Sequence, residues 1–226
     1  MASQLILPLA PHSKLTRADF VVAPGNARAV AFIDAWPNWP VPAAALYGPP
    51  GSGKSHLVAV WQARAEAVVI PAAALADIDP AALTGTGPVA VDDVDAAPAT
   101  EGRDRVLFAL IEAAGQAPVL FTGHEPPAAW PVVLPDLASR FSALLAFPLW
   151  APDDALLAAL AAKLFRDRQL AVPEAVIQRM IRLLERSPAA IRDFVARADE
   201  KALSEGRPVN LSLIRELLAE DDGSAQ

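Results

Sequence analysis

The chain has 226 residues, no cysteine, three histidines and a formal net charge of −7. This length is enough for one large core, or for a main domain with a smaller one. The lack of cysteine excludes disulfides and thiolate metal sites and fits a reducing compartment. No run of about 18 apolar residues occurs, so we expect a soluble, cytoplasmic protein without a membrane helix. An acidic chain without a basic stripe is a poor candidate for binding the DNA backbone by itself.

The first region alternates helical and strand patterns. Apolar spacing predicts a helix over 26–36, which Pro37 ends, and then a short buried strand over Ala43–Tyr47. A helix is expected after Lys54, followed by strands at AVVIP and PVAVDDVD and a helix over 102–114. Two more strands are expected at PVLFTG and ALLAFPL. Strands that alternate with helices indicate an α/β class with a five-stranded parallel sheet covered on both faces.

The pattern changes after residue 150. Four consecutive helices are predicted at DDALLAALAAKLFRDR, PEAVIQRMIRLLERS, SPAAIRDFVARADEKALSEG and NLSLIRELLAEDD. The last six residues, DDGSAQ, are expected to form a frayed tail. We therefore expect an N-terminal tail over 1–18, an α/β domain that binds nucleotide over 19–150, and a small helical lid domain over 151–226.

The segment GPPGSGKS matches the phosphate-loop pattern G-x-x-x-x-G-K-[ST], with a predicted strand before it and a helix after it. Glycines let backbone N–H groups turn toward phosphate oxygens, Lys54 supplies a charge for the terminal phosphates, and Ser55 can ligate Mg²⁺. A glycine-rich turn that matches by chance is the alternative, which the strand–loop–helix context disfavours. The residues expected to hold ADP or ATP in this segment are Gly48, Pro50, Gly51, Ser52, Gly53, Lys54, Ser55 and His56.

Polar side chains end two further strands. Adjacent carboxylates repel unless a cation or proton intervenes, so Asp92 is suited to hold Mg²⁺ through water and Asp93 to orient an attacking water. The alternative for the acids is a loop cap. The hydroxyl of Thr122 could hold the lytic water, although threonine commonly ends strands. Arg140 in LASRF and Arg192 in SPAAIRDF are the other candidates, and surface arginines are their alternative interpretation.

The order of FVVAPGN, GPPGSGKSHL, VAVDD, LFTG, LASRF and SPAAIRD resembles the AAA+ core of the DnaA family. The resemblance covers about residues 19–205, and the combination is more specific than any single motif. It implies an AAA+ phosphate-loop domain with a C-terminal helical lid. It also implies that the FVVAPGN segment contacts adenine, which places Val22 and Asn26 at the base of the nucleotide.

The resemblance also implies roles for the acids and arginines. Asp92 and Asp93 correspond to the Walker B pair and Thr122 to the sensor 1 region. Arg140 corresponds to the arginine finger, which acts on a neighbour's nucleotide, and Arg192 to the sensor 2 arginine of the lid. At sensor 1 the family usually reads T-S-D, whereas this chain reads TGH.

The apolar peptide QLILPL precedes the first predicted element. A short AAA+ module headed by such a peptide is similar to the Hda-type regulators that inactivate DnaA, whose peptide is of the type that docks on the DNA polymerase sliding clamp. The resemblance implies that Gln4 forms a hydrogen bond in a small pocket of the clamp, and that Leu5, Leu7 and Leu9 place their side chains in an apolar cleft. Pro8 belongs to the same predicted docking peptide. Such anchors suggest an affinity of order micromolar. The alternative is a strand that pads the core, which proline disfavours.

The implied function is negative regulation of chromosomal replication initiation. The nucleotide-bound protein would dock on the clamp and present Arg140 to ATP held by the DnaA AAA+ domain. The chain has few residues beyond the AAA+ region, so we expect no DNA-binding domain and only indirect contact with DNA. Its own ATPase is expected to be weak, and a homodimer is one option for its assembly. The alternatives are a helicase loader of the DnaC or IstB kind and a nucleotide-locked clamp adaptor that stimulates no hydrolysis.

Overall fold

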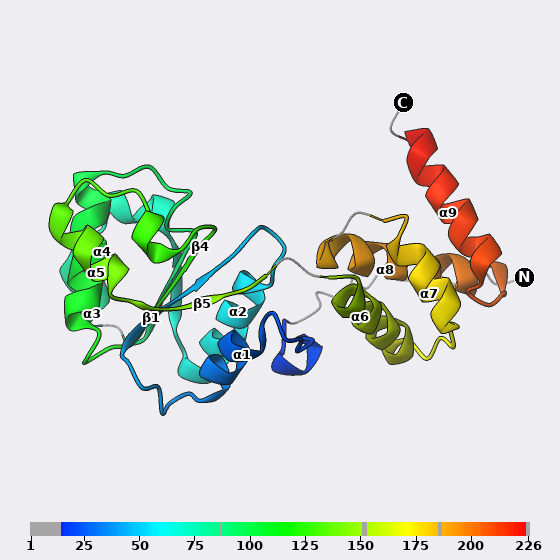
Figure 1. The fold of residues 1–226 in the computed structure, drawn as a ribbon, viewed down its shortest axis with the longest axis horizontal. Coiled ribbons are helices and arrows are strands. Elements are labelled where there is room, and N and C mark those ends of the chain that lie inside the picture. Colours follow the sequence, from blue (N-terminus) through cyan, green and yellow to red (C-terminus); the bar gives the residue numbers. More distant parts are fainter. Residues whose placement is uncertain (1–14, 86, 151–152, 185–186, 225–226) are drawn as a thin grey trace, which may run out of the picture.

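The computed structural model describes residues 15–85, 87–150, 153–184 and 187–224. Within these residues an α/β part and a helical part lie side by side (Figure 1). The described residues contain no helix that is long and apolar enough to cross a membrane. The residues predicted to dock on the clamp lie outside the described part of the chain: Gln4, Leu5, Leu7, Pro8 and Leu9.

A five-stranded parallel sheet forms the centre of the α/β part, with the strand order β2–β3–β4–β1–β5. The strands are β1 (Ala43–Tyr47), β2 (Val68–Pro71), β3 (Val89–Asp92), β4 (Val119–Gly123) and β5 (Leu145–Pro148). Because all strands run in the same direction, the residues that follow β1, β3 and β4 meet at one edge. The predicted five-stranded parallel sheet is confirmed.

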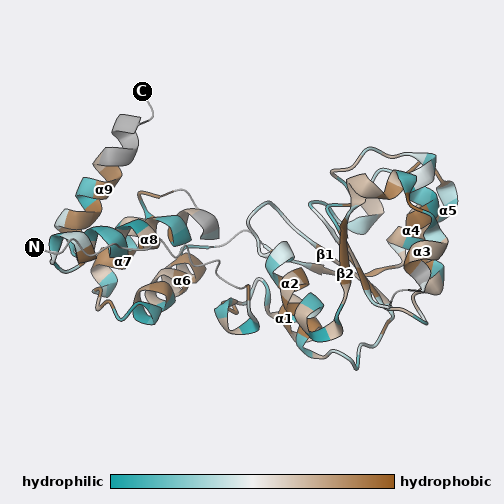
Figure 2. Cartoon of the chain, turned by 180° about the vertical axis from the view of Figure 1, so that it is seen from behind, coloured by the Kyte–Doolittle hydropathy of each residue, from teal (hydrophilic) through white to brown (hydrophobic). Residues whose placement is uncertain are grey.

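Helices cover both faces of this sheet. Successive side chains of a strand point to opposite faces, and the strands carry apolar side chains on both. Val91 and Phe121 pack with one cluster, whereas Leu46 and Leu120 pack with the other. Figure 2 shows the hydrophobic colouring along the strands. Helices α1 (Ala27–Asp34) and α2 (Lys54–Ala65) cover one face. The elements over the other face are η2 (Ala72–Asp77), α3 (Pro80–Thr84), α4 (Glu101–Ala113), η3 (Pro127–Ala129) and α5 (Pro135–Ser142).

The helical part has a hydrophobic cluster of its own, which includes the fully buried Phe194. Its helices are α6 (Asp154–Asp167), α7 (Glu174–Ile181), α8 (Pro188–Glu205) and α9 (Leu211–Ser224). The four predicted helices are confirmed, but α7 stops at Ile181, where a tight turn joins the Leu183 N–H to the Met180 carbonyl at 3.0 Å. The prediction of a frayed tail is wrong up to Ser224, where α9 ends. The packed turns earlier in α9 nucleate the helix, and adding further turns to it is easier than starting a new helix.

The sequence pattern missed the short helices. The five-residue α3 has no apolar period, and it begins where the Asp79 carboxylate accepts from the Ala81 N–H at 3.0 Å. Helix α5 begins at Pro135 in a proline-rich segment and buries only Leu137 and Phe141. The helix predicted over 26–36 is confirmed in position and is shorter, Ala27–Asp34.

Candidate nucleotide-binding site

The loop between β1 and α2 requires glycine. Gly48, Gly51 and Gly53 have φ of 152°, 75° and 104°. A Cβ atom on Gly48 would lie 2.0 Å from the Leu149 carbonyl oxygen, and one on Gly53 would lie 2.8 Å from the Phe20 ring. These are approaches that only glycine permits. The loop leads into the N-terminus of α2, where the helix dipole favours an anion.

Lys54 is the first residue of α2 and is 6 % exposed. Its ammonium group donates to the carbonyls of Gly48 at 2.7 Å and Pro49 at 3.2 Å. Burial lowers the pKa of Lys54, and the negative charges of Asp93 and Asp92 partly oppose that shift. The cation therefore lies in the loop, close to Asp92 at the end of β3 and to Asp93 directly after it.

A buried hydroxyl holds those two acids in place. Thr122 is fully buried at the end of β4, donates to Asp92 Oδ1 at 2.5 Å and accepts from the Asp93 N–H at 2.9 Å. Asp93 itself adopts a left-handed backbone with φ of 54°. Because the one hydroxyl proton of Thr122 goes to Asp92, this side chain aligns the acids. That it also holds a lytic water stays a prediction.

The residues at this edge fit a magnesium ion. The Ser55 hydroxyl lies 3.4 Å from Asp92 Oδ2, so the two oxygens can share one ion directly or through water. The described residues contain no group of three His, Cys, Asp or Glu that could hold a metal. Mg²⁺ usually binds phosphate oxygens, water and one or two protein groups, so this arrangement suits it when a nucleotide supplies the phosphates.

A cavity of about 380 Å³ opens between this loop and the helical part. From the helical part come Arg192 and Pro188 of α8 and two leucines of α6, and Pro188 lies 3.7 Å from a Cβ built on Gly51. Burial lowers the pKa of the Arg192 guanidinium, while Asp19 raises it. The lining residues are Leu15, Asp19, Phe20, Val21, Asn26, Pro50, Gly51, Ser52, Gly53, Lys54, Ser55, His56, Asp93, His124, Leu156, Leu160, Pro188 and Arg192.

The FVVAPGN segment reaches the cavity through Val21 and Asn26, and the adenine contacts of Val22 and Asn26 stay predictions. The side chain of Val22 is 49 % exposed and lies outside the cavity, whereas Val21 lines it and packs against the cluster of the helical part. Neighbouring residues of an extended segment point to opposite sides, which explains the difference. Asn26 is buried, donates to the Val21 carbonyl at 3.1 Å and accepts from the Ala23 N–H at 2.9 Å, so it fixes this loop.

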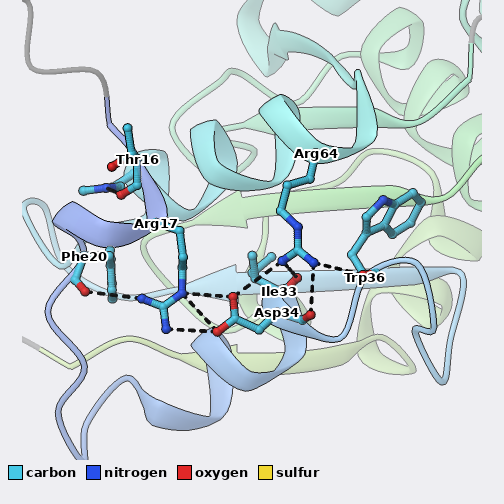
Figure 3. Close-up of polar contacts among 8 residues, drawn as sticks. Thr16, Arg17, Phe20, Ile33, Asp34, Trp36 and Arg64 are labelled. Atoms are coloured by element: carbon cyan, nitrogen blue, oxygen red, sulfur yellow. Dashed lines mark hydrogen bonds and ion pairs between the residues drawn. The ribbon is translucent and has the colours of Figure 1, made fainter.

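The segment that enters the cavity is anchored by an arginine–aspartate network (Figure 3). Arg17 Nε donates to Asp34 Oδ1 at 2.9 Å, and Arg64 donates to the Trp36 carbonyl at 3.1 Å. This network ties η1 (Arg17–Asp19) to α1 and α2. It fixes the approach of Phe20, which lines the cavity.

His56 is a predicted nucleotide contact and has a structural contact as well. Its Nε2 lies 2.8 Å from the Thr16 carbonyl oxygen, and its ring meets the Phe20 ring edge-on at 5.1 Å. Burial lowers the pKa of His56. The side chain lines the cavity and also holds the segment before it.

Arg140 lies apart from the cavity. Its side chain on α5 is 50 % exposed, its Nη2 atom is 2.8 Å from Glu112 Oε1, and its guanidinium lies 5.8 Å from the centre of the Phe108 ring. It is absent from the described residues that line the cavity. The structure thus brings Arg192 to the candidate site and leaves Arg140 accessible on another surface.

Several lining residues were missed by the sequence analysis. Phe20, Leu156 and Leu160 enter only through packing, and nothing local marks them. His124 had a local signal, because it follows a strand that ends beside the acids and the phosphate loop. Asp95 caps the loop after that strand, since its carboxylate accepts from the His124 N–H at 2.7 Å.

Comparisons with known proteins identify the fold. No protein-family model matches the sequence, and no curated protein sequence matches it significantly. Domain III of the Thermotoga maritima replication initiation protein DnaA superposes with a TM-score of 0.73 at 20 % identity, covering 95 % of this chain and 98 % of that one. AMPPCP-bound DnaA from Aquifex aeolicus gives 0.77 at 15 % identity, over 93 % and 70 % of the two chains.

A solved structure of a different protein shares the arrangement. The Thermotoga maritima RuvB Holliday junction branch migration motor gives a TM-score of 0.64 at 15 % identity, over 83 % of this chain and 65 % of that one. The fold therefore extends beyond replication initiators. This chain has the AAA+ fold seen in the DnaA domains.

Proposed function

We propose that this chain is a nucleotide-binding AAA+ protein that restrains the initiation of chromosomal replication, in the manner of Hda-type regulators. It binds ADP or ATP with Mg²⁺ in the cavity, docks on the sliding clamp through its N-terminal peptide, and supplies Arg140 to ATP bound by DnaA. The observation that supports this most is the separation of its two arginines. Arg192 lines the protein's own cavity, whereas Arg140 is half exposed away from it.

Nucleotide binding is supported by the chemistry of the cavity. A glycine loop, a buried lysine and a hydroxyl beside a carboxylate meet at one edge of the sheet. These groups suit a phosphate chain and its magnesium ion. The AMPPCP-bound relative carries an ATP analogue, which agrees with this use of the fold.

Arg140 suits a role on a second protein's nucleotide. A guanidinium that approaches the phosphates of a neighbour stabilises charge in the transition state and can accelerate hydrolysis by about 10³–10⁵. To reach a phosphate, Arg140 must leave Glu112. Both side chains are about half exposed, so that pair contributes at most about 1 kcal/mol and opposes the exchange weakly.

The clamp-docking step rests on the resemblance of QLILPL to clamp-binding peptides. A net charge of −7 gives the protein little affinity for the DNA backbone by itself. Docking on a clamp that encircles DNA supplies that contact and brings the protein near DNA-bound DnaA. Docking thereby raises the effective concentration of this protein around DnaA.

The experiment is a reconstitution of clamp-loaded DNA, DnaA carrying radiolabelled ATP, and this protein. We expect the wild-type protein to accelerate hydrolysis of the DnaA-bound ATP and Arg140→Ala to abolish the acceleration while still binding nucleotide and clamp. Arg105→Ala is the matched control, because Arg105 of α4 is likewise exposed and paired with a glutamate, Glu101. It should stimulate like the wild type.

Each other outcome has a defined meaning. Equal stimulation by Arg140→Ala and the wild type would refute the role of Arg140 as an arginine finger. Clamp binding by the wild type without any stimulation would favour the nucleotide-locked adaptor. Alanine at Gln4, Leu5 and Leu7 together should abolish clamp binding, and unchanged binding would refute the docking peptide.

A further inference from the structure

Helix α4 carries a fully buried ion pair that takes no part in the nucleotide site. The side chains of Arg103 and Asp104 are 1 % and 0 % exposed, and Arg103 Nη2 lies 2.7 Å from Asp104 Oδ1. Neither is among the described residues that line the cavity. Burial removes both charges from water, so such a pair adds little net stability compared with apolar residues of similar size. Its distinguishing feature is the set of segments that it joins.

The guanidinium of Arg103 bridges two loops. Nη1 donates to the carbonyls of Val94 at 3.3 Å and Ala97 at 2.8 Å, both in the loop that follows β3 and its acids. Nη2 donates to the carbonyl of Pro131, in the loop that leads to α5. Because Nε and Nη2 also donate to Asp104, all five N–H groups have an acceptor. The two loops are therefore fixed relative to α4.

Asp104 holds the beginning of α5. Its Oδ2 atom accepts from the backbone N–H groups of Val133 at 2.5 Å and Leu134 at 3.1 Å. Leu134 directly precedes the first residue of α5, and its own side chain forms no cap. A carboxylate beside a helix N-terminus also interacts favourably with the helix dipole. Asp104 thus supplies from α4 the N-terminal partner that the local sequence of α5 lacks.

The same face of α4 contacts the other end of α5. Asp104, Phe108 and Glu112 are spaced four residues apart, which places them along one side of the helix. In the last turn of α5, the Arg140 guanidinium lies 5.8 Å from the centre of the Phe108 ring and 2.8 Å from Glu112. The backbone of Arg140 is therefore held in place by α4, and only its exposed side chain has to move when it leaves Glu112.

We propose that Arg103 and Asp104 are positioning residues for Arg140. They fix the start of α5, and with it the place from which the Arg140 side chain reaches the phosphates of a neighbour. The inference rests on the proposed function, in which Arg140 acts on ATP bound by DnaA. A displacement of about 1 Å caused by a distant substitution can cost about 100-fold in rate. Release of the start of α5 therefore slows hydrolysis although Arg140 keeps its charge.

The test uses two variants of the full chain. Arg103→Met with Asp104→Leu removes both charges together, so it leaves no unpaired buried charge. Asp104→Asn keeps the side-chain volume and weakens the hold on α5. Should one of them fail to fold, the other decides. Hydrolysis of DnaA-bound ATP is measured on clamp-loaded DNA at rising concentrations of each variant.

We expect the maximal rate to fall by about 10- to 100-fold. The concentration for half-maximal stimulation should stay within about twofold of the wild type, because a positioning defect affects the reaction and not the docking. The dissociation constant for Mg-ADP should also change by less than about twofold, since the pair lies outside the cavity. Hydrogen exchange of the Val133 and Leu134 amides should become faster, while that of Leu120 in the sheet stays unchanged.

Glu101→Leu with Arg105→Met is the matched control, because it removes an exposed ion pair from the same helix. It should equal the wild type in every measurement. Faster amide exchange with a wild-type maximal rate would overturn the inference, and so would unchanged exchange. A higher half-saturating concentration at an unchanged maximal rate would assign the pair to docking and overturn it as well. In these cases stimulation by the wild type leaves the proposed function standing. A wild type that stimulates no hydrolysis would refute the proposed function and this role with it.

Discussion

The two sides of the cavity are built in different ways. On the phosphate side, Ser55, Asp92 and Thr122 come from three adjacent elements and are joined by hydrogen bonds. On the other side, Arg192 and Pro188 belong to a helical part with its own hydrophobic cluster. One polar link between the sides is the Lys163–Asp19 ion pair, at 3.2 Å between partly exposed groups.

This difference teaches where rigidity and movement lie in the site. The phosphate side is held within the sheet's own core, so it keeps its geometry without help from the helical part. The side that Arg192 provides depends on how the helical part packs against the loop. A nucleotide that contacts both sides stabilises their association by mass action, and release of the nucleotide weakens that association.

The substitutions with the largest expected effect test whether the two parts have separate hydrophobic cores. Phe194→Ala removes a fully buried ring from the helical cluster, and Phe121→Ala removes one from the sheet cluster. Each should cost about 3–5 kcal/mol of unfolding free energy. In calorimetry we expect two transitions, with Phe194→Ala lowering only that of the helical part and Phe121→Ala only that of the sheet. One shared transition, lowered equally by both, would contradict separate cores.

Lys54→Ala tests the phosphate side. The ammonium group is the main cation of the loop, and charge-assisted bonds to phosphate are worth about 1.5–3 kcal/mol. We therefore expect the affinity for Mg-ADP to fall by about 10- to 100-fold, measured by isothermal titration calorimetry. The Arg105→Ala variant serves again as a control, and we expect its dissociation constant for Mg-ADP to equal that of the wild type. Binding by Lys54→Ala at the wild-type level would place the nucleotide elsewhere.

The phosphate side could be predicted from sequence because its geometry is local. The loop GPPGSGKS connects one strand to one helix, and its glycines are needed for backbone angles that only the loop itself sets. The strands were predictable for a related reason. A strand buried on both faces is a continuous apolar run, as in VLF before Thr122.

The other side could not be predicted in detail, because packing between distant segments decides it. Whether Val21 or Val22 faces the cavity depends on how the segment is held by Asn26 and on the helical cluster beside it. The end of α7 likewise follows from a turn that its apolar pattern does not show. Phe20 reaches the cavity from a turn that Arg17 anchors to Asp34 and that His56 contacts at Thr16.

Arg192→Ala should have a smaller effect than loss of the lysine. Burial lowers the pKa of Arg192, yet a guanidinium remains charged at neutral pH, so it can attract phosphates across the cavity. We expect about tenfold weaker ATP binding and a smaller upward shift of the helical transition when ATP is added. Arg179→Ala, an exposed arginine of α7, is the control. An unchanged ATP-dependent shift in Arg192→Ala would mean that the nucleotide does not join the two sides through this residue.

The smallest effect concerns His56, whose side chain joins the phosphate side to the segment that enters the cavity. Burial lowers the pKa of His56, against the hydrogen bond to Thr16, which raises it. A histidine whose pKa is lowered by folding makes its full contribution to folding stability at pH values above its pKa in the unfolded chain, which is about 6.5. That contribution is lost as pH falls below this value, because the unfolded chain takes up the proton first. We expect the nucleotide-free sheet transition to weaken between about pH 7 and 5 in the wild type and to change less in His56→Gln, which can still donate to the Thr16 carbonyl. Equal pH dependence in the two proteins, measured by denaturant unfolding, would show that protonation of this side chain does not limit the stability of the phosphate side.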